Sequence, residues 1–433
     1  MLVQGAPLLA AGVLSIVIAR TIGPSGNGHF ALLVTLTGFA AMAASLGLTA
    51  GITYEVSRRR WAVRQAFRMS YLAALVLGLA GFLGGLGFFV FAHDSVFKGI
   101  SIGLAILALS SLPPALAYSY ADVILLARER YEGYAGLELS HSMTLLLVGA
   151  GLAIPFGLTG AAIGLPAAAV VGALFGAILL LGEARRDQVV DSGDSMPRAL
   201  RFGLLAWGGN LLQQINYRFD VIILGGFATA RDVGVYSVAL TLTGIAWILP
   251  QALQTVLFPR TASLAESAGI GEISSTEEDE ALARAVRHGV LLEIPTAVIV
   301  VLLLVIGVPL LYGPSFHDTI VLGFILLPGV LVLGEAKILA SAIAGRGKPR
   351  YAFYSSLISM PITLALYFSL IPLAHARGAA VASTISYLLT SVLTYVFFRK
   401  VARISLRQAF VPGRADLADY RVAAALARER LSR

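Results

Sequence analysis

The sequence predicts an all-α integral membrane protein with about twelve transmembrane helices. Three observations predict this class: long apolar segments follow one another, charged residues are few, and lysines and arginines fall on alternate connections. Hydrophobic residues make up 58% of the 433 residues and charged residues only 13%. A soluble domain could not cover its surface with so few polar side chains. A transmembrane β-barrel is excluded, because its strands alternate in polarity over short runs, whereas these segments are continuously apolar.

A helix that crosses a bilayer needs roughly 20 mostly apolar residues, and twelve segments meet that requirement. Their approximate bounds are 2–19, 29–54, 69–92, 100–126, 137–157, 160–182, 203–226, 234–258, 289–312, 320–344, 355–373 and 379–398. Only a short turn with the sequence FGLTG, at residues 156–160, separates the fifth segment from the sixth.

The basic residues predict the orientation. Twenty-six of the 32 lysines and arginines fall in the even-numbered connections and the tail, and four fall in the odd-numbered connections. Cytoplasmic loops carry the excess of basic residues in membrane proteins, so we expect both termini to be cytoplasmic. The first segment follows Met1 and lacks a small-residue cleavage site, so we expect a retained helix. The excess of arginine over lysine favours a bacterial or archaeal cytoplasmic membrane.

Composition also limits the partners and cofactors. The net charge of +8 is mostly this topology signal, with some attraction to anionic lipid headgroups, so no nucleic-acid partner is expected. Cysteine is absent from the sequence, and no metal-ligand spacing stands out. The segment GRGKP at 345–349 lacks the spacing of a Walker A motif. We therefore expect no cofactor and no metal, and any transport by such a chain would be powered by an ion gradient, by the substrate gradient or by consumption of the product.

An internal repeat indicates two six-helix halves. The segment GHFALLVTLTG at 28–38 aligns without gaps to GVYSVALTLTG at 234–244, and two shorter matches follow in the same order. An even number of helices in each half makes this a parallel repeat, which transporters use as two rocking bundles. The predicted domains are an N-terminal bundle with its linker at 1–202, a C-terminal bundle at 203–398, and a basic cytoplasmic tail at 399–433. The tail has the spacing of an amphipathic surface helix.

Several short motifs resemble those of a known family. The segment ARTIGPSGNGHF at 19–30 resembles the turn that opens the polysaccharide and O-antigen flippases. The segments NYRFDVIILG at 216–225, VGVYS at 233–237 and LFPR at 257–260 are similar to later elements of that family. These flippases belong to the multidrug/oligosaccharidyl-lipid/polysaccharide (MOP) exporter superfamily.

The resemblance implies both a fold and a function. It implies two helical bundles around a central cavity, as in MATE-like transporters, and a flippase for a polyprenyl-diphosphate-linked oligosaccharide. The expected partners are that glycan lipid, membrane lipids, a coupling cation (H⁺ or Na⁺), and polysaccharide polymerase or assembly proteins.

Polar residues within apolar segments are the candidate site residues, because such residues are costly in a bilayer and tend to face a cavity or one another. The seventh segment is the richest in them, and Arg218 is a natural ligand for a diphosphate because a guanidinium donates paired hydrogen bonds to phosphate oxygens. The alternative is that Arg218 and Asp220 pair with each other or with headgroups. The substrate-binding candidates are Arg218, Asp220, Asn210, Gln213, Gln214, Tyr217, Arg20 and Lys337.

Intramembrane carboxylates and a histidine are candidates for coupling a cation. Glu138 and His141 are three residues apart and share a helix face, so they could form a pair that takes up a proton. Glu335 and Lys337 are two apart, so each needs a partner elsewhere. The ion-coupling candidates are Glu335, Asp122, Glu138, His141 and Glu293. The alternative for several of them is a polar residue at a helix end that reaches water.

Three other functions remain open at this point. A multidrug or organic-cation antiporter on the same fold would favour carboxylates over a fixed arginine. A lipid II flippase differs mainly in the glycan, and fourteen helices would be expected there. A membrane-embedded enzyme is less favoured, because the odd-numbered connections are too short for a folded outer domain.

Overall fold

In the computed structural model, the described residues are 2–187, 196–251, 276–346, 348, 350–401, 405–413 and 416. Over these residues the chain forms helices and no strand. The α-helices are α1 (Leu2–Ser45), α2 (Leu48–Ser57), α3 (Val63–Phe91), α4 (Ile102–Leu109), α5 (Leu112–Ala127), α6 (Tyr131–Thr144), α7 (Gly151–Ala184), α8 (Met196–Phe227), α9 (Ala230–Gly244), α11 (Thr276–Leu302), α12 (Asp318–Gly345), α13 (Arg350–Arg399) and α14 (Leu406–Phe410). Short π and 3₁₀ segments complete them: η1 (Leu145–Ala150), η2 (Ile245–Trp247), η3 (Leu303–Tyr312) and η4 (Pro314–Phe316).

Three of the long helices are each interrupted by one residue with a positive φ. These residues are Gly23 in α1 (φ 67°), Gly157 in α7 (φ 57°) and His375 in α13 (φ 47°). All three lie in connections that the sequence predicts between neighbouring transmembrane segments. A glycine adopts this backbone conformation without a steric penalty, whereas His375 adopts it at a cost in strain.

The chain folds back on itself after two of these interruptions. A Cβ on Gly160 would meet the Leu152 carbonyl at 1.9 Å, so the two sides of the Gly157 turn are in contact. Beyond His375, the Tyr367 and Ser383 hydroxyls are 3.2 Å apart. The predicted pairs of segments are thus present as hairpins. Eight helices in the described ranges are long and apolar enough to cross a membrane. The chain is a multi-pass membrane protein, and the count of twelve remains a prediction.

The chain divides into two compact units. Unit 1 holds Met1–Val238, Pro309–Asp318 and Phe368–Ala379, and unit 2 holds Ala239–Val308, Thr319–Tyr367 and Ala380–Arg433. Unit 1 extends through α8, because α8 packs against α1 and α2. The predicted division into bundles at residue 202 remains a prediction.

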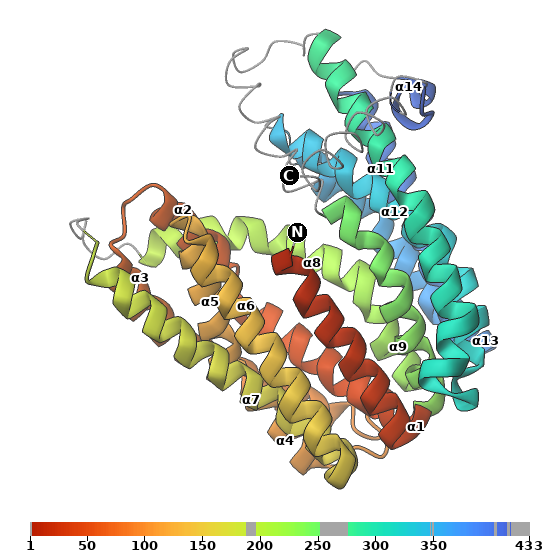
Figure 1. Ribbon diagram of the computed structural model, residues 1–433, viewed down its shortest axis with the longest axis horizontal. Coiled ribbons are helices and arrows are strands. Elements are labelled where there is room, and N and C mark those ends of the chain that lie inside the picture. The colour runs from red at the N-terminus through yellow and green to blue at the C-terminus, as the bar shows by residue number, and fades with distance from the viewer. Residues whose placement is uncertain are drawn as a thin grey trace, which may run out of the picture. The chain divides into compact units, whose positions relative to one another are not determined.

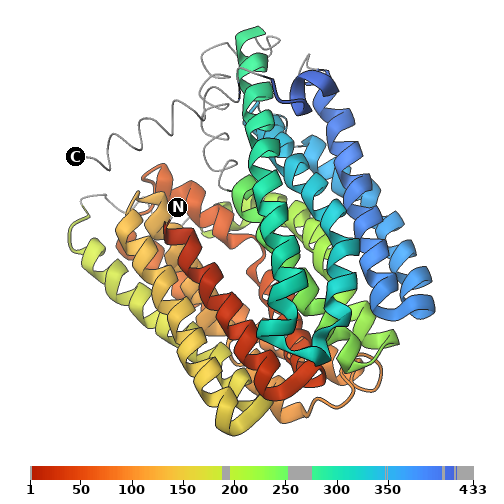
Figure 2. The same cartoon turned by 45° about the vertical axis from the view of Figure 1, so that its right-hand side comes forward.

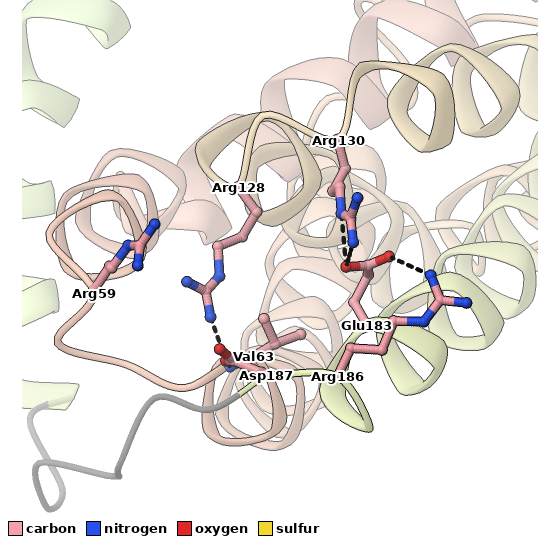
Figure 3. A pocket seen from close by; sticks show the side chains of 7 residues that line it. All are labelled: Arg59, Val63, Arg128, Arg130, Glu183, Arg186 and Asp187. Atoms are coloured by element: carbon pink, nitrogen blue, oxygen red, sulfur yellow. Dashed lines mark hydrogen bonds and ion pairs between the residues drawn. The ribbon is translucent and has the colours of Figure 1, made fainter.

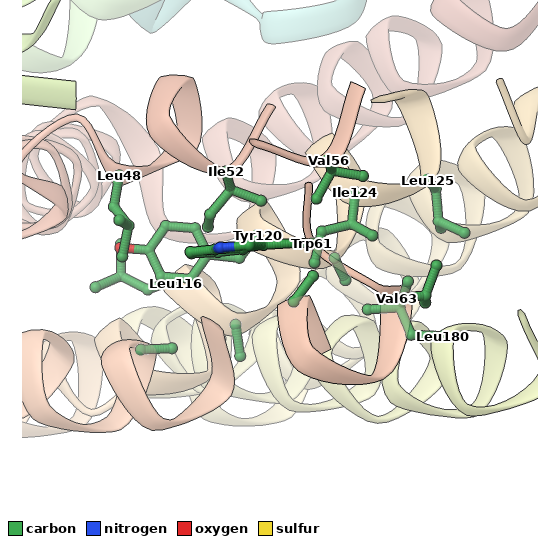
Figure 4. Close-up of a cluster of buried hydrophobic side chains, with 14 of the residues drawn as sticks. Leu48, Ile52, Val56, Trp61, Val63, Leu116, Tyr120, Ile124, Leu125 and Leu180 are labelled. Carbon is green, nitrogen blue, oxygen red and sulfur yellow. The ribbon is translucent and has the colours of Figure 1, made fainter. Parts of the chain in front are cut away.

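Unit 1 is built around α5. This helix packs against α3 and α7 (Figure 1), and α1 lies along α6 and α7 (Figure 2). Trp61 and Tyr120 are completely buried in one of its apolar clusters, between Ile52 of α2 and Leu180 of α7 (Figure 4). These two aromatic rings are large side chains that fill the cluster, while small residues let the helices approach each other closely.

The glycines of α7 are packing positions, and their pairwise spacing of four residues is the small-xxx-small pattern that predicts close helix packing. Gly160, Gly164, Gly172 and Gly176 are all buried. A Cβ on Gly164 would lie 2.6 Å from the Gly149 Cα, and one on Gly176 would lie 2.7 Å from the Ala121 Cβ. Lipid gives no hydrophobic drive for helices to associate, so such small residues bring backbones into close dispersion contact.

The repeated segments meet at equivalent atoms. A Cβ on Gly28 would lie 1.8 Å from the Ala230 carbonyl oxygen, and one on Gly234 would lie 1.9 Å from the Pro24 carbonyl oxygen. Pro24 and Ala230 are separated by the same number of residues as Gly28 and Gly234. A self-complementary contact of this kind is what a twofold relation between two copies produces, so it supports the internal repeat. The Asn27 amide strengthens the contact by donating to the Gly234 carbonyl at 3.1 Å.

Close backbone contact also joins α2 to α8. Gly47 approaches Gly203, where a Cβ on Gly47 would lie 2.2 Å from the Gly203 carbonyl, and Gly51 approaches Ala199. Beyond them, the buried Glu55 carboxylate forms an ion pair of 3.0 Å with Arg198. Small residues therefore make this contact, and the ion pair between Glu55 and Arg198 lies at one end of it.

Unit 2 brings together α11, α12 and the end of α13. Its apolar cluster includes Val286 of α11, Ile338 and Ile343 of α12, and Phe398 of α13. The short helix α14 packs on α11. Its N-terminus is closed by a capping box, in which Ser405 and Gln408 satisfy each other's backbone amides.

A buried ion pair holds the described part of the tail on α11. Arg287 donates to Asp416 at 2.7 Å and to the Gln408 carbonyl at 2.6 Å, and the Asp416 carboxylate also accepts from the Gly413 amide. The Arg287 guanidinium holds the pKa of the Asp416 carboxyl below its usual value. The predicted amphipathic helix over 414–433 otherwise lies outside the described residues.

We predict that Gly28→Ala and Gly234→Ala each lower the melting temperature strongly. Each new methyl group would overlap a backbone carbonyl, and overpacking typically costs about 1–3 kcal/mol. Gly38 and Gly244 occupy equivalent positions in the repeat, and nothing lies within 4 Å of a Cβ there. Alanine at these two control positions should be neutral or mildly stabilising. Thermal unfolding in detergent, followed by tryptophan fluorescence, measures this. Equal melting temperatures for all four variants would contradict the close approach.

We also predict that the Asp416 pair stabilises the tail in a pH-dependent way. Because the folded pKa of Asp416 is lowered, its contribution is fully present above an ordinary carboxyl pKa of about 4 and is lost as the pH falls through the lowered value. Asp416→Asn should therefore expose the tail to protease at pH 7 but make little difference at pH about 2. Proteolysis with an acid-active and a neutral protease measures both arms. Identical cleavage of the two proteins at pH 7 would contradict the anchoring role.

Candidate functional site

The polar residues of helix α8 differ in their exposure. Gln213, Gln214 and Arg218 are exposed, whereas Tyr217 and Asp220 are buried. Gln214 and Arg218 are four residues apart, so they lie one above the other on the helix. None of the ion pairs found among the described residues involves Arg218. The side of α8 with Gln214 and Arg218 therefore carries a fixed positive charge beside one amide, whereas the Gln213 amide donates to the Tyr217 hydroxyl at 3.5 Å. Asn210 lies on the same helix, but the placement of its side chain is outside what the structure describes.

Asp220 faces the interior of unit 1. Its carboxylate accepts a hydrogen bond from the Tyr236 hydroxyl of α9 and one of 2.8 Å from the Val221 amide. Both Asp220 and Tyr236 are completely buried. This placement favours a role in fastening α8 to α9 over contact with a substrate. Sequence reasoning missed Tyr236, although it lies sixteen residues after Asp220, in the family-like VGVYS segment.

Arg20 covers the end of a helix. Its Nε donates to the Leu311 carbonyl at 2.7 Å, and a terminal nitrogen donates to the Leu310 carbonyl. These carbonyls belong to the last turn of η3, and the last carbonyls of a helix need partners from outside it. A cation at a helix C-terminus also interacts favourably with the helix dipole. In this conformation, Arg20 fastens the segment Pro309–Asp318 to α1 within unit 1, and its side chain remains exposed.

Three predicted ion-coupling residues come together in unit 1 around Tyr118. The Tyr118 hydroxyl of α5 donates to Glu138 of α6. The His141 ring stacks on the Tyr118 ring, with centroids 4.3 Å apart and planes 12° apart. Asp122 lies one turn after Tyr118 on α5, and one of its carboxylate oxygens is buried without a hydrogen bond among the described residues. Glu138 and His141 are thus joined through a tyrosine that sequence reasoning did not single out.

A glycine of α7 makes room for this cluster. A Cβ on Gly172 would lie 2.9 Å from the Tyr118 ring and 3.4 Å from the His141 ring. Any larger residue at Gly172 would displace the stacked pair. The spacing of Gly172 and Gly176 predicts a close contact at this point but not its aromatic partner.

The other two ion-coupling candidates lie on facing helices of unit 2. Glu293 of α11 is 8% exposed, and Glu335 of α12 is 4% exposed. Each carboxylate lies against a glycine of the other helix: a Cβ on Gly289 would be 2.8 Å from Glu335, and one on Gly334 would be 2.5 Å from Glu293. Within the described ranges, both Glu335 oxygens and one Glu293 oxygen lack a hydrogen-bond partner. A buried ionised carboxylate without a partner is very unfavourable, so this pair is suited to hold a proton or a small cation.

Lys337 is separated from those carboxylates by its place on α12. Its ammonium lies 3.6 Å from the centroid of the Trp247 ring, a cation–π contact. The Trp247 indole is held in turn by donation to the Val330 carbonyl at 2.9 Å. Lys337 is half-buried, and this contact explains how the charge is tolerated inside an apolar helix. Over the described residues, no group of three or more His, Asp or Glu could hold a metal ion.

Comparison of the fold with solved structures identifies the class of protein. The protein folds like transporters of the MOP superfamily. It superimposes on a structure of the lipid II flippase MurJ in an inward closed conformation with a TM-score of 0.73 and 11% identity, covering 92% of this chain and 87% of that one. An inward-facing MATE family multidrug transporter of the MOP superfamily matches with a TM-score of 0.64 and 18% identity, over 91% of this chain and 94% of the other. At these identities the likeness shows the fold alone.

The family follows from the sequence match. Residues 1–265 match the model of the polysaccharide biosynthesis protein family, and the chain belongs to that family. The probable flippase AglR of Haloferax volcanii is 30% identical over 192 residues, which is 43% of this chain and 39% of that protein. The match therefore spans about two fifths of the length of that relative.

Proposed function

We propose that this protein is a flippase that moves a polyprenyl-diphosphate-linked oligosaccharide across the cytoplasmic membrane by alternating access. The observation that supports the proposal most is that α8 has an exposed polar side and also lines an apolar pocket. One exposed side presents Arg218 with Gln214, and the exposed Gln213 lies next to it in sequence, on the side of Tyr217. The adjacent residues Phe219 and Ile222 line an apolar pocket of about 570 Å³ together with residues of α1 and α3. One helix thus offers a polar, cationic face and an apolar pocket.

A glycan lipid has the matching chemistry. Its diphosphate carries negative charge that a guanidinium binds through paired hydrogen bonds. Its sugar hydroxyls suit the Gln214 amide beside Arg218, and its isoprenoid chain suits a pocket whose lining includes alanine, glycine and phenylalanine. Membership in the polysaccharide biosynthesis family supports an O-antigen or exopolysaccharide repeat unit as the glycan. Polymerase and assembly proteins would then act on the product.

The two carboxylate clusters are proposed as the sites that couple flipping to a cation. In unit 2, Glu293 and Glu335 are buried with unsatisfied oxygens. In unit 1, Glu138 already accepts from Tyr118 while Asp122 retains an unsatisfied oxygen. The unit 2 pair is the stronger candidate, because neither glutamate has a neutralising partner among the described residues. H⁺ and Na⁺ are the cations considered.

The unit 2 carboxylates also favour a second candidate function, a cation antiporter of the same superfamily. An organic cation would be attracted to Glu293 and Glu335, whereas a fixed positive charge at Arg218 would repel it. A lipid II flippase remains an alternative that differs in the glycan. The basic residues favour an orientation with both termini in the cytoplasm.

We predict that Arg218→Ala abolishes or strongly slows flipping. The assay follows protein-dependent exchange of a fluorescent polyprenyl-diphosphate oligosaccharide between the leaflets of proteoliposomes. Loss of one charge-assisted phosphate contact, about 1.5–3 kcal/mol, should slow exchange by roughly tenfold or more. Arg201→Ala, on the same helix and also exposed, is the control and should exchange as the wild type does. Equal exchange by both variants would discard the Arg218 site. Absence of exchange with several glycan donors, together with drug-cation uptake driven by a proton gradient, would favour the antiporter.

We predict that Glu335→Gln uncouples transport from the cation. Glutamine keeps the shape of the side chain but cannot ionise, so the exchange rate should no longer respond to an imposed proton or sodium gradient. Exchange without a gradient should persist, because the substitution leaves Arg218 intact. Glu132→Gln, at the start of α6 on an exposed residue, serves as the control. A gradient response in Glu335→Gln equal to that of the wild type would exclude Glu335 from coupling.

A further inference from the structure

A charged pocket lies at one end of unit 1, apart from α8 and from both carboxylate clusters. Its volume is about 420 Å³. Figure 3 shows that its side chains come from three connections: the chain after α2, the turn between α5 and α6, and the end of α7. The lining residues are Arg59, Val63, Arg128, Arg130, Glu183, Arg186 and Asp187. Four guanidinium groups face two carboxylates, so the lining carries a surplus of two positive charges.

The carboxylates organise three of the arginines. Arg128 pairs with Asp187, which also accepts from the Val63 amide at 2.7 Å. Glu183 pairs with Arg130 at 2.6 Å and more loosely with Arg186 at 4.0 Å. These ion pairs orient the Arg128 and Arg130 guanidinium groups, whereas Arg186 is mostly exposed and only loosely held. Arg59 takes part in none of them, and a guanidinium has five N–H donors of which one pair satisfies only a few. Donors are therefore left over on the wall of the pocket.

Two backbone turns beside the pocket have the same strained conformation. Helices α2 and α5 both end in the same turn, in which the second residue beyond the helix has a left-handed conformation: Arg59 with φ 55° and Glu129 with φ 59°. In each turn the next amide reaches back to a helix carbonyl, Arg60 to Glu55 and Arg130 to Leu125, both at 2.9 Å. Glycine is the usual residue at this position of a Schellman turn. An arginine there costs stability that a glycine would not, and residues kept under strain cluster at functional sites.

We propose that this pocket binds a phosphate group. Its surplus of two positive charges matches a phosphate dianion or a diphosphate, and guanidinium groups bind phosphate oxygens through paired hydrogen bonds. The pocket lies among helix ends on the side that the basic residues predict to be cytoplasmic, where basic pockets between transmembrane helices bind anionic headgroups. The phosphate can come from an anionic phospholipid of the inner leaflet or from a soluble phosphate compound.

A substitution that relaxes the backbone while removing the charge separates binding from folding. Arg59→Gly should raise the melting temperature of the protein in neutral detergent, because glycine suits the left-handed conformation. Arg58→Gln is the matched control: it removes the same charge from the neighbouring residue, which lies over the Tyr54 ring at 4.7 Å and does not line the pocket.

The full chain in neutral detergent is titrated separately with phosphatidylglycerol, phosphatidylcholine and inorganic pyrophosphate, and the melting temperature is followed. We expect an anionic probe to raise the melting temperature of the wild type and of Arg58→Gln. Its apparent affinity should be at least roughly tenfold weaker for Arg59→Gly. Phosphatidylcholine, whose headgroup has no net charge, should have little effect.

The pattern of responses distinguishes the two sources of phosphate. An Arg59-dependent response to phosphatidylglycerol alone assigns the pocket to a lipid headgroup, and a response to pyrophosphate assigns it to a soluble phosphate compound. Responses to both probes that are the same in Arg59→Gly as in the wild type overturn the proposal. So does the absence of any response in the wild type.

Discussion

The close approach of two helices at Gly28 and Gly234 is the contact on which the arrangement of unit 1 depends. Neither position has space for a single methyl group, because backbone carbonyls occupy the place on both sides. Apolar side chains gain little by leaving lipid for a helix interface, so association depends on close packing of backbones and on hydrogen bonds. The Asn27 amide supplies such a hydrogen bond to Gly234 at the same point. The contact also joins the two copies of the repeat through equivalent residues.

Burial divides the intramembrane polar residues into those that are satisfied by the fold and those that are not. Asp220 accepts hydrogen bonds from Tyr236 and a backbone amide, and Lys337 lies against the Trp247 ring. Such residues hold helices together. Glu293 and Glu335 lie against glycines, which offer no side-chain donor, and the cost of burying them is left uncompensated in the described residues. Ionisable residues inside a bilayer are costly and are usually functional. The coupling proposal therefore rests on these two glutamates.

Much of the fold could be predicted from the sequence, because the determinants are local. Segment length, charge asymmetry and glycine spacing each act within one helix or one connection, and they place the interruptions at Gly157 and His375 in the expected turns. The pairing of side chains was harder to predict. The sequence shows Arg218 and Asp220 only as two polar residues of one apolar segment, and the position of Tyr236 in three dimensions shows which partner Asp220 has. For the same reason, Tyr118 could not be identified as the residue between Glu138 and His141.

Counting basic residues predicts the orientation of the chain but not the role of each arginine. The positive-inside rule requires only a surplus on one side of the membrane, and any arginine in those connections satisfies it equally. The structure gives them different surroundings: Arg198 pairs with the buried Glu55, Arg287 anchors Asp416, and Arg58 lies over an aromatic ring. Arg59 instead occupies a backbone position that suits glycine and lines a pocket with excess positive charge. Topology does not require an arginine at that strained position, since its neighbours Arg58 and Arg60 already supply the charge. The reason for its presence therefore has to be sought in what the pocket binds.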